Sequence, residues 1–245
     1  MVRMSEASAP GARRGRTPSA DIERELLAAA EAVLVRDGPG GLTVRAVASE
    51  AGIAPMGVYN RLGGKDGLVD ALLIKGFDRL RAAVDAAMND TAEPSMRARF
   101  LSCGLSYRQF ALDNPHFYAI MFEDAFLHEH DNPEVEEHAR AAFGALVRIV
   151  ELSAAAGVIA ALDPVEVGQQ IWSTLHGAVA LELRGLVLTP DPRYTYQSLL
   201  TTLIRGLAPA EDQDRNHPER RRQWSPLYPA GGPSCGPMTG SNWAE

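Results

Sequence analysis

The sequence predicts an all-α protein in which a small N-terminal three-helix domain precedes a larger C-terminal helical domain. Apolar residues recur at the three- and four-residue spacing of helices along most of the chain. The breaks fall at Asn114-Pro115, Asn132-Pro133 and Asp163-Pro164, where proline disfavours helix at the preceding residue. No alternating pattern long enough for a strand appears, so helices are favoured throughout.

Composition limits where the protein works. The chain has 245 residues, of which 7% are aromatic. No run approaches the ~20 consecutive apolar residues of a membrane-spanning helix, and the N-terminus lacks the apolar core of a signal peptide. Cys103 lies in an apolar helix and Cys235 in a Gly/Pro-rich segment, and we interpret both as reduced thiols. These features predict a cytoplasmic protein with no membrane partner and no cofactor.

The first helix is predicted from Ile22 to about Asp37, where Gly38-Pro39-Gly40-Gly41 ends it. Two short helices joined by a tight turn follow. Thr43 can cap the first, and Pro55 suits the first position of the second. The inward faces consist of apolar residues at helical spacing: Val44, Val47, Ala48, Ala51, Val58 and Leu62. This arrangement is a helix-turn-helix, which predicts sequence-specific DNA binding.

The outward face of the second short helix suits a major groove. Met56, Gly57, Asn60 and Arg61 point away from the core, with Tyr59 near the edge. Small side chains allow close approach, and the polar ones can meet base edges. Gly57 costs ~1 kcal/mol of helix stability relative to alanine. We interpret this glycine as a residue that lowers helix stability but allows close approach to DNA.

The charge distribution is compatible with this role. The chain carries a net charge of −7, but residues 1–70 hold nine basic and nine acidic residues, so the acidic excess lies elsewhere. An acidic body would repel DNA and orient the neutral N-terminal part toward it. Residues 1–19 are rich in Arg, Pro, Gly and Ser and predict a disordered basic arm. Arg13, Arg14 and Arg16 either reach the DNA or are simply solvated.

Residues 22–73 resemble the DNA-binding domain of the tetracycline-repressor (TetR) family. The resemblance lies in the helix from Ile22 to about Asp37 and in these stretches: Leu42-Thr43-Val44-Arg45-Ala46-Val47-Ala48, Gly52-Ile53, Val58-Tyr59-Asn60-Arg61-Leu62 and Lys65-Asp66-Gly67-Leu68. It implies a dimeric regulator, usually a repressor relieved by a small ligand, that binds a palindromic DNA operator. Leu62 replaces a commoner aromatic residue and Gly63-Gly64 a stiffer linker, which puts the angle between the following helices in question.

The resemblance also assigns roles to residues. Thr43, Tyr59 and Lys65 match phosphate-contacting positions. Arg45 and the run of Pro55, Met56, Gly57, Asn60 and Arg61 match positions that often read bases. The complete predicted DNA-binding set is Thr43, Val44, Arg45, Pro55, Met56, Gly57, Tyr59, Asn60, Arg61 and Lys65.

Helices are predicted beyond this part near 65–88, 95–112, 115–127, 133–157, 164–187 and 193–207. The expected division is a basic arm at 1–19, the DNA-binding domain at 20–66, a regulatory and dimerisation domain at 67–208 and a disordered tail at 209–245. The last two helices carry apolar residues that we interpret as covering more than one face: Val167, Ile171, Leu175, Val179, Leu183, Leu199, Leu200, Leu203 and Leu207. We therefore expect these two helices to form a homodimer.

Aromatic residues are few, yet most cluster in the C-terminal helices. They predict a cavity for a small, mostly apolar effector, although core packing would account for many of them. The predicted ligand-binding set is Tyr107, Phe110, Phe117, Met121, Phe122, Trp172 and His176. Trp172, His176 and Gly177 also resemble the Trp–His–Gly (WHG) signature of one C-terminal subfamily. His176 either contacts the ligand or is a hydrogen-bonded core histidine.

The sequence does not favour two other classes of function, metal binding and catalysis. The segment Glu123 to His138 contains His128, His130 and several carboxylates, which could bind zinc, but the acids are unpatterned and a solvated loop is favoured, so no metal site is predicted. No catalytic motif appears, so no catalytic residue is assigned and the protein is not expected to be an enzyme. The alternatives are an enzyme with an appended helix-turn-helix and a dimeric interaction protein without operator binding.

Overall fold

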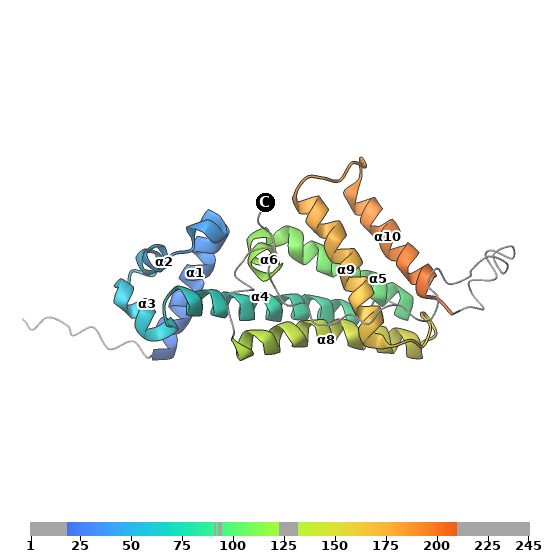
Figure 1. Ribbon diagram of the computed structural model, residues 1–245, viewed down its shortest axis with the longest axis horizontal. Coiled ribbons are helices and arrows are strands. Elements are labelled where there is room, and N and C mark those ends of the chain that lie inside the picture. The colour runs from blue at the N-terminus through green and yellow to red at the C-terminus, as the bar shows by residue number, and fades with distance from the viewer. Residues whose placement is uncertain (1–18, 91, 93–94, 123–131, 210–245) are drawn as a thin grey trace, which may run out of the picture.

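The computed structural model describes residues 19–90, 92, 95–122 and 132–209, and all regular structure in these ranges is helical. Three helices form a compact head at one end (Figure 1). A long helix leads from this head into a body of five further helices (Figure 1). The elements, in order, are α1 (Ser19–Gly41), α2 (Val44–Glu50), α3 (Pro55–Leu62), α4 (Lys65–Met88), α5 (Met96–Asp113), α6 (Pro115–Phe122), α8 (Pro133–Ala155), α9 (Pro164–Leu183) and α10 (Pro192–Leu207).

The helix-turn-helix in the head is confirmed. Thr43 caps α2, because its Oγ1 accepts a hydrogen bond from the backbone N–H of Ala46 at 3.1 Å. Gly52 takes a positive φ of 66° in the turn, and Pro55 begins α3. The predicted end of the first helix is also found, because the backbone of Gly38 is non-helical at φ 70° and only a short turn continues to Gly41.

The junction between α3 and α4 depends on glycines. Gly63 and Gly64 have φ of 72° and 96°, a region that side chains disfavour. A Cβ on Gly67 would lie 1.5 Å from the carbonyl oxygen of Leu62, so only glycine lets the end of α3 rest on the first turn of α4. The angle that the sequence left in question is therefore determined by close backbone contact rather than by a stiff linker.

Helix α4 belongs to both parts of the molecule. Its first half packs into the head through Leu68, Val69 and Leu72, which are fully buried. Its second half packs against α5 and α8 in the body (Figure 1). The expected domain boundary between residues 66 and 67 thus falls within the first turn of a continuous helix.

An ion-pair cluster ties α1 to α4. Both Lys75 and Arg79 contact the Glu31 carboxylate at 2.5 Å. Partial burial by itself would raise the pKa of Glu31, but the hydrogen bonds from Arg79 and Lys75 lower it. The guanidinium of Arg79 also lies 5.2 Å from the ring centroid of Phe117 in α6, so the same cluster reaches the body.

The helices of the body follow the predicted breaks. Ser95, Asn132, Asp163 and Asp191 each accept a backbone N–H at the start of α5, α8, α9 and α10. Helix α9 ends at Leu183, four residues earlier than predicted. Of the predicted helix 115–127, residues 115–122 are helical, and the remainder lies outside the described residues. Most of the arm at 1–19 and most of the tail at 209–245, with Cys235, also lie outside them.

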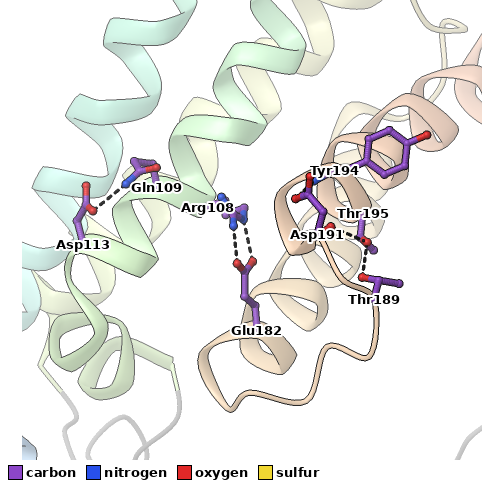
Figure 2. Close-up of polar contacts among 8 residues, drawn as sticks. All are labelled: Arg108, Gln109, Asp113, Glu182, Thr189, Asp191, Tyr194 and Thr195. Carbon is purple, nitrogen blue, oxygen red and sulfur yellow. Dashed lines mark hydrogen bonds and ion pairs between the residues drawn. The ribbon is translucent and has the colours of Figure 1, made fainter.

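A buried ion pair joins α5 to the end of α9. Arg108 donates from Nε to Glu182 at 2.7 Å and also contacts the second carboxylate oxygen, as the dashed lines in Figure 2 show. Both side chains are almost completely buried. The Arg108 guanidinium lies 5.9 Å from the ring centroid of Tyr196, which brings α10 into the same contact. The contacts of Arg108 therefore join three helices of the body, namely α5, α9 and α10.

The apolar residues from which we predicted a dimer of the last two helices do not cover a second face of α9. Val167, Ile171, Leu175 and Val179 are instead all buried in the core of the single chain. Leu200 is likewise buried, and Leu203 and Leu207 are partly buried against the same core. Helical spacing showed that these residues face inward but not which neighbour they meet. None of the described helices is long and apolar enough to cross a membrane.

Candidate functional site

The predicted DNA-binding residues lie together on α2, α3 and the start of α4. Eight of them are exposed, and Val44 and Gly57 are half-buried. Met56 and Tyr59 are 65% and 55% exposed, unusual values for large apolar side chains in a folded head. Arg45, Arg61 and Lys65 add positive charge to this face. The arrangement offers apolar, polar and cationic groups for a nucleic-acid groove.

Thr43 has a structural role that leaves its hydroxyl available. Its oxygen accepts from the backbone of α2, but the hydroxyl hydrogen can still be donated to a phosphate. Arg36 differs, because it is held by Asp37 at 2.9 Å and by Glu50 at 2.7 Å. Those hydrogen bonds raise the pKa of its guanidinium. Arg36 therefore reinforces the head, whereas Arg45 is exposed and forms no ion pair with any other described residue.

Packing inside the head gives a second reason for Gly57, besides the expected approach to DNA. A Cβ at this position would lie 2.6 Å from Cγ2 of Ile53 in the preceding turn. That contact is too close for any side chain unless the turn shifts. The glycine is thus required by packing inside the helix-turn-helix, whether or not DNA approaches it.

A cavity of about 400 Å³ lies in the body among α4, α5, α6, α8 and α9. Of the predicted ligand-binding residues, Tyr107, Met121, Phe122 and Trp172 line it, whereas Phe110, Phe117 and His176 do not. Lining residues that sequence reasoning missed include Phe77, Leu80, Val84, Phe100, Cys103, Phe143 and Leu175. Helical spacing marked Leu80 and Val84 as inward-facing, but it carried no signal that a space lies beside them.

Phe117 and Phe110 are core residues rather than cavity residues. Phe117 is 1% exposed and packs beside Gly76 and beneath Arg79. Phe110 is 7% exposed and does not reach the cavity. Phe110 is three residues from Tyr107 and Phe117 is four from Met121, so helical spacing alone did not distinguish these core residues from their cavity-lining neighbours.

His176 belongs to a polar cluster behind the cavity wall. The Tyr118 hydroxyl lies 2.6 Å from Nδ1 of His176, and the hydroxyls of Tyr107 and Tyr118 are 3.2 Å apart. The rings of Tyr118 and His176 also stack at 5.4 Å. Burial raises the pKa of Tyr107 to about 12, so its hydroxyl stays protonated. The half-buried His176 thus has hydrogen-bond partners within the protein, and its contact with a ligand stays a prediction.

The described residues contain no group of three or more His, Cys, Asp or Glu side chains that could hold a metal ion. His138 instead places Nδ1 2.8 Å from Asp78 and joins α8 to α4. The other acidic and histidine residues of the segment, from 123 to 131, lie outside the described residues. Burial also raises the pKa of Cys103 to about 12, so this thiol on the cavity wall stays protonated.

Comparison with known protein families gives one match in the head and another in the body. Residues 26–72 match the family described as bacterial regulatory proteins, tetR family. Residues 100–203 match the tetracyclin repressor-like C-terminal domain, which includes Trp172 and His176.

Solved structures and curated relatives extend over most of the chain. A protein of unknown function from Rhodococcus sp. RHA1 is 32% identical, with a TM-score of 0.69, and the match covers 77% of this chain and 96% of that one. A bacterial regulatory protein of the tetR family from Rhodococcus RHA1 is 22% identical, with a TM-score of 0.58 and coverage of 77% and 98%. The HTH-type transcriptional regulator Rv1816 of Mycobacterium tuberculosis is 23% identical over 76% of this chain and 92% of its own length.

The fold and these matches agree along the chain. The head has the helix-turn-helix of a DNA-binding regulator, and the body has the helical domain that accompanies it in this family. Both the family and the fold are those of transcriptional regulators rather than of enzymes. This chain therefore belongs to the TetR family of transcriptional regulators.

Proposed function

We propose that this protein is a ligand-responsive repressor that binds a palindromic DNA operator as a homodimer. The observation that carries the proposal is the exposed face of α2, α3 and the start of α4, where Arg45, Tyr59 and Lys65 accompany the short side chains of Thr43 and Gly57. Each copy would place α3 in a major groove, with two half-sites separated by a helical turn or a multiple of it. Binding would weaken steeply with salt as phosphate contacts displace counterions.

Arg45 and Tyr59 would contribute in different ways. An arginine can donate two hydrogen bonds to a guanine edge, so Arg45→Ala should cost ~1–3 kcal/mol and relax preference at one base pair. Tyr59 would position α3 against a phosphate, so Tyr59→Ala should weaken binding to all sequences alike. Gel-shift titration on the region upstream of its own gene and on point-mutated versions tests both. Arg97→Ala in α5 is the control, and equal changes in base preference for both variants would contradict these roles.

The dimer would use the exposed side of α9 and α10. Leu181, Leu186 and Leu188 are 49%, 56% and 99% exposed at the end of this helix pair, where Tyr194 is 68% exposed. Exposed apolar side chains gathered in one place favour association. Leu181→Glu should produce monomers in sedimentation velocity and abolish operator binding. The control is Leu162→Glu, which changes an equally exposed leucine outside both helices.

The effector would occupy the cavity of the body. An effector that binds more tightly to a conformation unable to match the operator would release the DNA. Ala142 lines the cavity, so Ala142→Phe should fill part of it and reduce the ligand response while leaving operator affinity intact. Ala86→Phe places the same ring on the exposed side of α4 as a control. An undiminished response in the cavity variant would locate the effector elsewhere.

A further inference from the structure

We propose that the effector is an amphipathic anion, with an apolar portion inside the cavity and an anionic head group between Arg81 and Arg140 at its edge. This inference rests on the proposed ligand response and names the chemical class of the ligand. It follows from the sign of the charges around the cavity, from the exposure of those charges and from the way the inner polar groups already bind one another.

The charges that line the cavity are all positive. Arg81 from α4 and Arg140 from α8 are part of its wall, and none of the described Asp or Glu residues is. The sign of the charge on this wall is opposite to that of the chain as a whole, which carries a net charge of −7. Two arginines from neighbouring helices beside an apolar space would attract an anion and disfavour a cation.

Both arginines can reach a ligand at the rim. Their side chains are 47% and 71% exposed, which places the charged ends in water while the methylene stems cover the cavity wall. Arg81 lies 3.8 Å from Asp78, and Arg140 lies 3.5 Å from Glu136. These are long, exposed contacts on the same helix, and such contacts contribute little. A carboxylate or sulfonate head group could therefore replace them without loss of a strong bond.

The inner end of the cavity favours an apolar group. The wall there is formed by Phe77, Phe100, Met121 and Leu175. The hydroxyl of Tyr107, which also lines the cavity, lies within 3.3 Å of both Tyr118 and His176. Because these groups bind one another, a ligand need not supply a polar partner there. An anion placed at this end would instead lose its hydration without gaining a cation.

Gln169 adds a neutral donor at the rim. It lines the cavity from α9, is exposed and donates to the hydroxyl of Ser173 at 3.1 Å. Like the two arginines it is an exposed residue of the cavity wall, and the three come from three different helices. A head group there would have donors from α4, α8 and α9, which places the charged end of the ligand outside and its apolar end inside.

The test compares linear ligands that differ only in the head group. Binding of octanoate, dodecanoate and hexadecanoate is measured by isothermal titration calorimetry on the full chain, beside 1-octanol, 1-dodecanol and 1-hexadecanol. We expect the best carboxylate to bind at least tenfold more tightly than its matched alcohol, and we expect this advantage to shrink as salt is raised.

Two double variants locate the head group. R81Q/R140Q should reduce the carboxylate advantage to less than threefold while leaving alcohol binding unchanged. R97Q/R148Q removes the same charge from exposed positions on α5 and α8 that do not line the cavity, and it should keep the advantage. The A142F variant should weaken binding of both ligand types.

Three results would overturn the inference: no preference for carboxylates in the unaltered protein, a preference that survives R81Q/R140Q, or no binding of any carboxylate in the series. Operator binding is measured on the same preparations. If the operator is bound while the head-group preference is missing, the ligand class is wrong and the regulator stands. If the operator is not bound either, the proposed function itself fails.

Discussion

The DNA-facing head and the body place their important side chains in opposite ways. In the head, Met56, Tyr59 and Arg45 point into solvent from two short helices. In the body, side chains from five helices line one shared cavity. The head is shaped by local devices, namely the Thr43 cap and the glycines of the α3–α4 junction, whereas the body depends on contacts between residues far apart in sequence.

This difference predicts whether a substitution in each part changes DNA binding or stability first. Substitutions on the face of the head should alter DNA binding with little effect on stability, because exposed side chains contribute few packing contacts. Substitutions in the body should cost stability first, because buried polar groups lose their partners. Four experiments can break or sharpen this contrast.

The largest effect is expected at the buried Arg108–Glu182 pair. Arg108→Met leaves the Glu182 carboxylate buried without its partner, which typically costs ~3–5 kcal/mol. Urea unfolding followed by circular dichroism measures the loss. The double variant R108M/E182L should recover most of it, because it removes both buried charges. A single variant as stable as the unaltered protein would show that this contact does not hold the body together.

The second-largest effect is expected at Gly67, a residue of the head whose substitution should reduce stability as well as DNA binding. A methyl group there would overlap the Leu62 carbonyl, so Gly67→Ala must shift α3 against α4. Overpacking of this kind costs ~1–3 kcal/mol, and operator affinity should fall with it. The control is Gly144→Ala, because a Cβ there meets nothing within 4 Å and should stabilise its helix by up to about 1 kcal/mol. Equal effects on thermal unfolding would contradict this distinction.

Thr43 allows structure and DNA binding to be separated in the head. Thr43→Ala removes the cap of α2 and should cost about 1 kcal/mol of stability along with operator affinity. Thr43→Asp keeps a capping oxygen but adds a negative charge that faces phosphate. It should therefore retain stability in thermal unfolding and lose operator binding in gel shifts. Tight binding by the aspartate variant would remove Thr43 from the DNA interface.

The smallest effect concerns Cys103 on the cavity wall. Burial raises the pKa of its thiol from 9.0 to about 12, so the folded protein keeps a proton that the unfolded chain loses. The associated stability is present below pH 9 and is lost as the pH rises toward 12. Between pH 8 and 10 the free energy of unfolding should decline, with a slope of at most about 1.4 kcal/mol per pH unit. In Cys103→Ala this decline should be smaller, and an identical profile would rule the thiol out.

Prediction from the sequence was more accurate for the head than for the body. The Thr43 cap, the Pro55 start and the apolar spacing of α2 and α3 are signals within a few residues, and the structure has each as predicted. The spacing predicted that Gly57 is exposed toward DNA, which stays a prediction, but it did not indicate the close contact with the Ile53 side chain four residues earlier. Gly67 belongs to a stretch that carries the family resemblance, but its spacing did not indicate the close contact with the backbone oxygen of Leu62.

In the body, periodicity predicted which residues face inward but not what they face. Val167, Ile171, Leu175 and Val179 lie on an inward stripe, which the spacing alone could not distinguish from a dimer surface. Likewise, Phe117 and Met121 lie one turn apart, yet only Met121 lines the cavity. A cavity is a space that several helices leave open, so it has no sequence pattern of its own.

The sequence by itself determined the helical class, the helix-turn-helix, the family resemblance and most helix boundaries. Those features depend on hydrogen bonds and side-chain spacing within one or two turns, which the order of residues states directly. Only the tertiary structure decided the Arg108–Glu182 contact, the position of His176 behind the cavity wall and the presence of both Arg81 and Arg140 in the wall of one cavity. The residues in each of these sets are distant in sequence, and packing of the helices is what brings them together.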